Sequence, residues 1–228
     1  MKKREKLINF YKVMVLMFLF VVYTFMVPIT PSKEFPLFVK IVIDTLFILI
    51  TYFMFKDIVN KSFKKIFEHP WKFFKYVLIF WLLFLILPSL YSSIMEKAFN
   101  INNPNNLGMW DLAKEVPTYL IFNMIVFAPF IEDMVFRNGF RVLIKNKFLY
   151  ILISTVVFAL FFAYTTNNGA TVNILGADVL LSYVFIVPYI ITGFISSYSY
   201  AKTDNIFVPI TIRIIQNIFL LFLYLNIK

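Results

Sequence analysis

Long runs of apolar residues dominate the chain, and short polar segments separate them. Four of these runs carry no charged residue: 13–32, 76–95, 148–177 and 179–201. Three further runs contain internal charges: 37–55, 117–137 and 205–227. A helix needs about 20 mostly apolar residues to cross the ~30 Å hydrocarbon core of a bilayer. The pattern therefore predicts an all-α, polytopic transmembrane helical bundle of about seven spans, and residues 165–168 end the span that begins at residue 148.

The segments between the runs are alternately rich and poor in basic residues, so one side of the membrane has many more of them than the other. With a cytoplasmic N-terminus, the inner segments contain Lys2, Lys3, Arg4, Lys6, Lys56, Lys61, Lys64, Lys65, Lys72, Arg137, Arg141, Lys145, Lys147 and Lys202. The outer segments contain only Lys33, Lys97, Lys114 and Lys228. Because basic residues accumulate in cytoplasmic loops, this asymmetry predicts an inner N-terminus and an outer C-terminus. The first run is long and lacks a clear small-residue cleavage site, which favours an uncleaved span over a signal peptide.

The composition excludes several classes of protein and site. Hydrophobic residues make up 61% of the 228 residues and charged residues only 15%, against roughly 25% charged in a soluble domain. The excess of 22 Lys and Arg over 12 Asp and Glu lies between apolar runs and forms no basic stripe, so nucleic acid is not an expected partner. There is no cysteine for a disulfide, a thiolate metal site or a nucleophile. The lipid bilayer is the expected surrounding.

The single histidine lies in a basic and aromatic segment rather than in an apolar run. His69 belongs to residues 61–72, which read KSFKKIFEHPWK. Two interpretations of this segment stay open: it lies in the inner headgroup layer, where anionic lipids attract lysine, or it is an ordinary positive inner loop. In both, His69 is interfacial rather than catalytic, because it is far in sequence from the charges inside the spans.

Charged residues within the spans need a partner or a function, because each costs ~2.5 kcal/mol or more at mid-depth. Lys40 and Asp44 are four residues apart, so they share a helix face and are expected to pair. Asp178 follows Asn173 and Gly176, where a helix is expected to begin, and an N-terminal or interfacial role fits it.

A third group of intramembrane charges occurs in residues 128–141, which read APFIEDMVFRNGFR. Asp133 and Arg137 can pair at a spacing of four, which leaves Glu132 on another face of the helix. The string resembles the EExxxR motif of the CAAX-protease and bacteriocin-processing family of intramembrane metalloproteases. The resemblance implies that Glu132 activates water for peptide hydrolysis and that Arg137 holds the two acids in place.

Two further motifs of that family occur in the correct order, but their histidines are replaced. The FxxxH motif aligns with STVVFALFFAY, in which Phe158 is followed by Phe162 at the histidine position. The HxxxN motif aligns with DNIFVPITIRIIQN, in which Arg213 replaces the histidine and Asn217 matches. The resemblance covers roughly residues 127–217. It divides the chain into an N-terminal transmembrane region of three spans and a basic loop, 1–116, and a family-like core of four spans, 117–228.

The loss of both histidines changes the expected chemistry. Peptide hydrolysis needs a general base near neutral pH and groups that stabilise the oxyanion. Phe162 can do neither, and Arg213 does not deprotonate in proteins, so it is neither a base nor a metal ligand. We therefore expect no metal and no cofactor, and an ion pair between Arg213 and Glu132 or Asp133. The alternative is that Arg213 extends to the inner surface of the membrane.

These observations leave three hypotheses for function. The first is a non-catalytic pseudoenzyme of this family in a bacterial cell membrane, which binds a membrane or cell-envelope protein or peptide, as relatives of the bacteriocin-immunity or cell-wall-enzyme type do. The second is a CAAX-type endopeptidase in which Glu132 and Asn217 suffice for catalysis. The third is a transporter or channel element, which the paired charges and only five glycines disfavour because transporter sites commonly contain broken helices.

Overall fold

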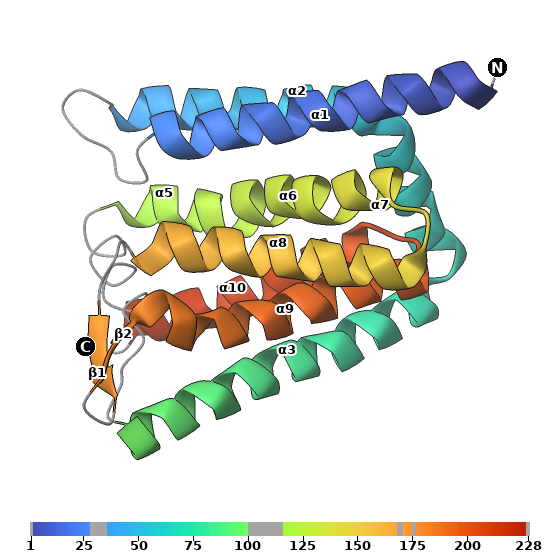
Figure 1. Ribbon diagram of the computed structural model, residues 1–228. Coiled ribbons are helices and arrows are strands. Elements are labelled where there is room, and N and C mark those ends of the chain that lie inside the picture. The colour runs from blue at the N-terminus through green and yellow to red at the C-terminus, as the bar shows by residue number, and fades with distance from the viewer. Residues whose placement is uncertain (1, 28–35, 100–115, 168–170, 175–176, 227–228) are drawn as a thin grey trace.

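The computed structural model describes residues 2–27, 36–99, 116–167, 171–174 and 177–226. Figure 1 shows long helices that lie side by side along the length of one bundle, with the N-terminus at one end and the C-terminus at the other. The long helices are α1 (Lys2–Met26), α2 (Leu37–Glu68), α3 (Pro70–Phe99), α8 (Lys147–Asn167), α9 (Leu181–Thr203) and α10 (Phe207–Asn226). A further continuous run contains α5 (Pro117–Phe122), η1 (Asn123–Phe127), α6 (Ala128–Asp133), η2 (Met134–Gly139) and α7 (Phe140–Leu143).

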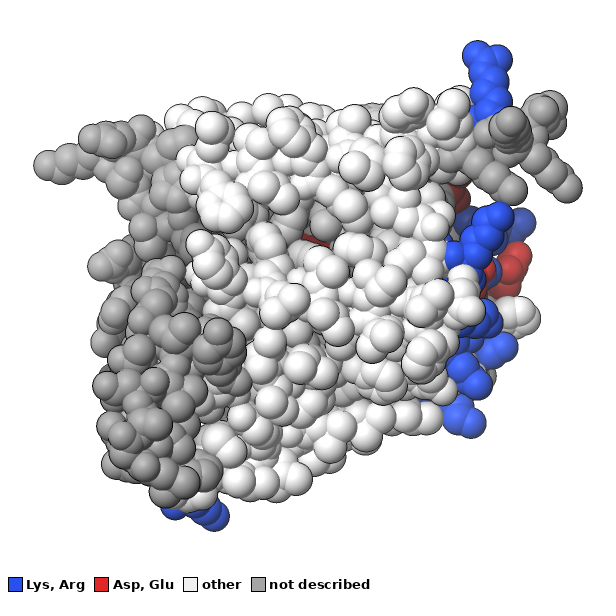
Figure 2. Space-filling view, viewed as in Figure 1, with Lys and Arg blue, Asp and Glu red and all other residues white. Residues whose placement is uncertain are grey.

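These helical segments confirm the predicted all-α membrane bundle, in the predicted order. Five of them are long and apolar enough to cross a bilayer: α1, α2, α3, the α5–α7 run and α8. α10 contains a shorter apolar helix, Phe207–Leu223, and α9 lies beside α8 and α3. The side of the bundle in Figure 2 is almost entirely uncharged. Large apolar side chains such as Phe18, Phe38 and Phe148 are 66%, 76% and 72% exposed on the surface, as expected where lipid is the solvent. The chain is a multi-pass membrane protein.

Several helices extend beyond the apolar runs from which they were predicted. α1 begins at Lys2 rather than at residue 13, and α2 continues from residue 55 to Glu68. The charged residues that end an apolar run are themselves good helix formers, so the helix continues into the aqueous layer. At Phe55 the backbone of α2 is non-helical (φ −122°, ψ 22°), and Figure 1 shows the later part of α2 crossing one end of the bundle.

The segment between α8 and α9 differs from the prediction. A helix start was expected near Asp178, but β1 (Thr171–Ile174) and β2 (Ala177–Leu180) form an antiparallel pair in which Asn173 is opposite Asp178. α9 begins after it, at Leu181. The β-branched residues of TVNI favour a strand at this point.

Basic residues gather at one end of the bundle, where α1 begins and where the α2–α3, α7–α8 and α9–α10 connections lie (Figure 2). This is the end that the charge asymmetry assigns to the cytoplasm. The position of one basic residue differs from the prediction. Arg137 was expected in an inner segment, but it is fully buried within the bundle, because the helix continues past it to Leu143. Lys33, Lys114 and Lys228, on the predicted outer side, lie outside the described residues.

The largest hydrophobic cluster lies between α1, α2, the α5–α7 run, α8 and α10. It includes Leu16 of α1, Phe47 of α2, Phe136 of η2, Phe158 of α8 and Ile210 of α10. Burial at this core therefore joins residues of both predicted regions, 1–116 and 117–228, and the division between them stays a prediction.

Candidate functional site

The helix that carries Glu132 contains two π-helical segments, one on each side of α6. η1 ends five residues before Glu132, and η2 begins two residues after it. Pro129, in the first turn of α6, has no N–H to donate, so the regular hydrogen-bond ladder is interrupted there. Segments of π-helix inside α-helices are frequent at functional sites, where they rotate the side chains that follow. Here they surround the acidic motif.

Asp133 and Arg137 form the predicted pair within this helix. Nε of Arg137 lies 3.3 Å from Oδ1 of Asp133, and both side chains are fully buried. Asn138 beside them is also fully buried, and Tyr200 of α9 donates a 3.4 Å hydrogen bond to its Oδ1. A buried guanidinium and carboxylate compensate each other's charge, so the pair contributes no net charge to the site.

Arg213 of α10 forms the predicted ion pair with the acids of the motif helix, so the prediction of a pair between two spans is confirmed. Its Nη2 donates to Oε2 of Glu132, and its Nη1 lies 4.0 Å from Oδ1 of Asp133. The side chains of Arg213 and Glu132 are each 12% exposed. Arg213 is therefore turned toward the acids within the bundle, and the alternative of an arginine that extends to the inner surface is wrong.

An aromatic ring of α8 covers the guanidinium groups of this site. The Cζ atom of Arg137 lies 4.2 Å from the ring centroid of Phe158, and the Cζ atom of Arg213 lies 5.7 Å from the same centroid. A cation over the face of an aromatic ring is attracted by the ring's quadrupole. Phe162, at the lost histidine position, packs instead against Phe158 and Phe136, with ring centroids 4.5 and 6.0 Å apart.

Asn217 lies against the first π segment. Its Nδ2 donates a 2.6 Å hydrogen bond to the carbonyl of Met124. In an α-helix, the carbonyl of Met124 would accept from the N–H of Ala128, but here that N–H donates to the carbonyl of Asn123. In a π-helix, the donor to the Met124 carbonyl would be residue 129, which is a proline and has no N–H. Asn217 therefore satisfies a carbonyl that the helix cannot satisfy. This contact lies eight residues before Glu132 in the motif helix.

The residues at this site do not fit a divalent metal ion. The described residues contain no group of three His, Cys, Asp or Glu side chains that could bind one. Two carboxylates are present, but a guanidinium lies against each of them. A metal ion would have to displace Arg213 from Glu132 and would still lie close to the positive charge of Arg137.

A second buried polar cluster lies nearer the outer end of the bundle. Lys40 and Asp44 are 1% and 0% exposed, and within the described residues no direct ion pair joins them. The hydroxyl of Tyr23 in α1 lies between the two: it accepts a 3.2 Å hydrogen bond from Lys40 Nζ and donates a 2.6 Å bond to Asp44 Oδ1. Tyr119 of α5 donates a 2.9 Å bond to Asp44 Oδ2. The expected pair is therefore a four-residue network across three helices.

Sequence reasoning gave no role to several residues that support the site. Ser154 of α8 donates a 2.6 Å hydrogen bond to the carbonyl of Phe136, and its hydroxyl lies 2.9 Å from that of Ser197 in α9. Phe158 was noted only as part of a motif, and Tyr200 was not singled out. Ser154, Ser197 and Tyr200 share one signal: they are polar residues inside otherwise uncharged runs, where an unsatisfied polar group is costly.

Comparisons with known proteins agree with the motifs. Residues 114–219 match the family model described as Type II CAAX prenyl endopeptidase Rce1-like. A curated relative, the "Membrane-embedded CAAX protease MroQ" of Staphylococcus aureus (strain USA300), is 28% identical over 120 residues. That alignment covers 50% of this chain and 42% of the relative, so the chain matches less than half the length of that protein. No solved structure matches the chain at a significant level. Both matches support the CAAX-protease-like membrane family that the motifs predicted.

Proposed function

We propose that this chain is a non-catalytic member of the family, which binds a membrane or cell-envelope protein or peptide partner in a bacterial cell membrane. The observation that carries the proposal is the ion pair of Arg213 with Glu132, formed by the residue that stands at a lost histidine position. A carboxylate that accepts from a guanidinium in a low-dielectric bundle is held in place as an anion. It is poorly suited to take up and release a proton during each turnover.

The surroundings of the pair support the same proposal. Phe158 covers the guanidinium groups, and Phe162 packs among aromatic rings, so neither replaces a histidine in proton transfer. Arg137 compensates Asp133, the second acid. The ion pairs of the site therefore serve to hold α6, η2 and α10 together. Binding of a partner without cleavage, as in bacteriocin immunity or in a scaffold for a cell-wall enzyme, needs no general base.

The alternative function is a CAAX-type endopeptidase in which Glu132 activates a water molecule. Two observations favour it: the family match includes the whole motif region, and the curated relative is named a protease. In addition, Glu132 is not sealed off, since its side chain is 12% exposed. Figure 2 shows a small acidic patch within the apolar side of the bundle, in the region of α6 and α8.

One experiment separates cleavage from its absence. The purified chain in detergent micelles is incubated with a farnesylated peptide that ends in a CAAX sequence, and mass spectrometry measures release of the terminal tripeptide. We expect the native chain to release no more tripeptide than Glu132→Gln. Release by the native chain that is absent in Glu132→Gln would overturn the proposal and establish the endopeptidase.

A second experiment tests partner binding in the membrane. The chain is crosslinked to its neighbours in membranes of the source cells and purified. The molecular mass of each crosslinked protein then shows whether that protein is intact or cleaved. We expect a specific partner at full length, recovered equally with the native chain and with Glu132→Gln. A partner recovered as a shortened product only with the native chain would contradict the non-catalytic function.

A further inference from the structure

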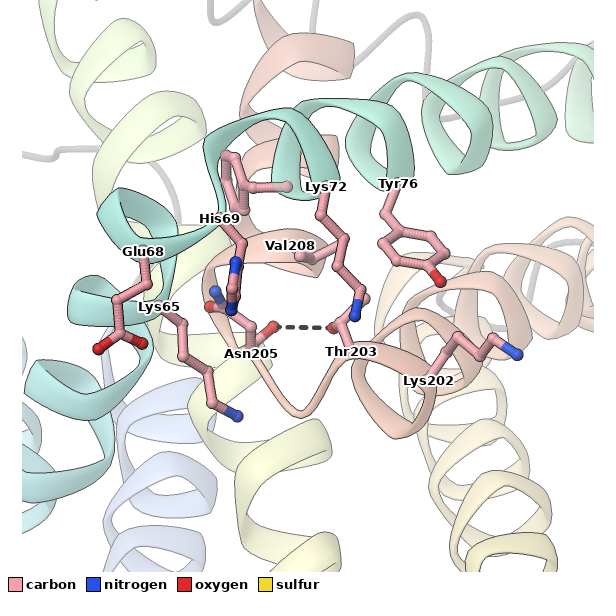
Figure 3. Close-up of a pocket in the computed structure, with 10 residues that line it drawn as sticks. Lys65, Glu68, His69, Lys72, Tyr76, Lys202, Thr203, Asn205 and Val208 are labelled. Atoms are coloured by element: carbon pink, nitrogen blue, oxygen red, sulfur yellow. Dashed lines mark hydrogen bonds between the residues drawn. The ribbon is translucent and has the colours of Figure 1, made fainter.

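A cavity of about 230 Å³ opens at the basic end of the bundle, away from Glu132. Its walls come from two helix connections that are far apart in sequence: the end of α2 with the first turns of α3, and the end of α9 with the start of α10. Figure 3 shows Lys65 on one side of the α9–α10 turn, Lys202 on the other, and Lys72 reaching from α3 toward Thr203 between them. Pockets for drug-sized molecules are commonly larger, about 300–1,000 Å³, so this cavity suits a small polar group.

The charges around this cavity leave two lysines uncompensated. Lys65 is bound to Asp204, with Nζ 2.9 Å from Oδ2, and Glu68 pairs with Lys64 at 3.7 Å. Lys72 and Lys202 both line the cavity and are exposed, and in the described part of the chain neither forms an ion pair. The net charge directed at the cavity is therefore positive, and it comes from two different helices.

The deeper wall of the cavity is apolar. Phe73 and Val208 line it and are buried, and Tyr76 is half-buried beside them. In the α2–α3 connection, next in sequence to lining residues of the cavity, Trp71 and Phe67 are 86% and 69% exposed. Aromatic side chains are enriched at the depth of lipid headgroups, so these rings place the α2–α3 connection, which forms part of the cavity wall, at the membrane–water interface. A ligand there meets positive charge toward the water and apolar surface toward the bilayer.

We propose that this cavity binds the phosphate of an anionic phospholipid of the inner leaflet. Lys72 and Lys202 bind the phosphate oxygens, and the acyl chains leave along Tyr76 toward the outer surface of α3. Basic pockets between transmembrane helices on the cytoplasmic side are suited to anionic headgroups, because a lysine near the surface attracts such lipids. The site is separate from Glu132, so the proposal does not depend on the function proposed above.

The test measures binding of fluorescent phosphatidylglycerol to the full chain in neutral detergent micelles. Lys72→Gln/Lys202→Gln should bind it roughly tenfold more weakly, because two lysines near the lipid are lost. The matched control is Lys56→Gln/Lys147→Gln, which removes two exposed lysines at the same end but outside the cavity and should change binding less than about twofold. An equal loss in both double variants, or no loss in either, would overturn the proposal.

Two further arms identify the ligand and guard against misfolding. Lys72→Arg/Lys202→Arg keeps both charges and should bind the lipid like the native chain; loss of binding in it would contradict the phosphate contact. Inorganic phosphate, at the same concentration as the lipid, should not displace phosphatidylglycerol, because it lacks the acyl chains that contact the apolar wall. Displacement by inorganic phosphate alone would show a site for soluble phosphate and overturn the lipid proposal.

Discussion

Because Glu132 and Arg213 form an ion pair, replacing either residue alone should lower the free energy of unfolding. Arg213→Leu leaves a carboxylate in the bundle without its partner, and breaking a buried pair in this way costs about 3 kcal/mol. Removal of both charges, in Glu132→Leu/Arg213→Leu, should restore part of that loss. We therefore expect the free energy of unfolding of the double variant, measured with denaturant in detergent, to exceed the value expected from adding the two single losses.

A control for this cycle combines Arg213→Leu with Glu68→Leu. Glu68 pairs with Lys64 at the inner end of α2 and does not belong to the site, so the two losses should add. Additive losses in the Glu132 and Arg213 cycle as well would mean that the two charges do not stabilise each other.

The hydrogen bond of Asn217 leads to a second prediction for single residues. Asn217→Ala removes the donor to the Met124 carbonyl and should lower the free energy of unfolding by about 1 kcal/mol. In a Pro129→Ala background, position 129 regains an N–H that the Met124 carbonyl can accept within the helix. The effect of Asn217→Ala should then become smaller, and the cycle measured by thermal unfolding should show coupling.

Pro188 offers the matched control, because it is also a proline inside a helix of the bundle, α9. Asn217→Ala should cost the same in a Pro188→Ala background as in the native chain. If Pro129→Ala leaves the effect of Asn217→Ala unchanged, the carbonyl of Met124 does not depend on that amide.

The sequence was sufficient to predict contacts between charged side chains, but not the side-chain hydrogen bonds to unpaired backbone carbonyls. The pairing of Arg213 with Glu132 follows from the high cost of isolated charge in a bilayer together with the order of the motifs. The role of Asn217 depends on which carbonyl the π segment leaves unpaired, and that depends on a local change from α to π geometry. Phe158 could not be distinguished from other core phenylalanines, because stacking on a guanidinium depends on the rotation of α8 relative to η2.

The network around Asp44 gives a prediction at the scale of whole helices. Tyr23 is the link from α1 to Lys40 and Asp44 of α2, and Tyr119 links the same carboxylate to α5. Tyr23→Phe keeps the ring but leaves buried Lys40 and Asp44 with fewer partners. We expect a loss of about 1 kcal/mol or more, and faster hydrogen exchange in the outer half of α1, measured by mass spectrometry.

Tyr11 is the control on the same helix, since it is 59% exposed and forms no hydrogen bond of this network. Tyr11→Phe should leave both the free energy of unfolding and hydrogen exchange unchanged. Equal effects of the two variants would show that the hydroxyl of Tyr23 does not hold α1 and α2 against α5.

At this scale the order of the helices was predictable, and their internal irregularities were not. Run length in a bilayer fixes the minimum length of a span, which is why the seven predicted runs correspond to helical segments of the described chain. The hairpin of β1 and β2 lies in a stretch without charge, where composition alone does not distinguish helix from strand. The kink at Phe55 has no proline or glycine that would mark it in the sequence.

For the whole molecule, an ion pair at the inner end joins the N-terminal region to the C-terminal core. Asp204 lies in the turn between α9 and α10 and accepts from Lys65 of α2, with Lys61 at 3.7 Å. Lys65 also donates a 2.7 Å bond to the backbone carbonyl of Asp204. Asp204 has a positive φ of 48°, a conformation that Asp and Asn tolerate better than most residues. Asp204→Asn therefore removes the charge and keeps the turn.

This contact predicts a dependence of stability on pH. Partial burial acts to raise the pKa of Asp204, but the hydrogen bond and charge of Lys65, together with Lys61 and Arg141, lower it overall. A carboxyl with a lowered pKa stabilises the fold above its unfolded pKa of about 3.9, and the contribution is lost as pH falls through the lowered folded value. The side chain is 64% exposed, so the contribution is at most about 1 kcal/mol. In thermal unfolding, Asp204→Asn should be less stable than the native chain at neutral pH, and the difference should disappear in acid. A difference that persists unchanged below the folded pKa would show that the charge of Asp204 does not hold the two regions together.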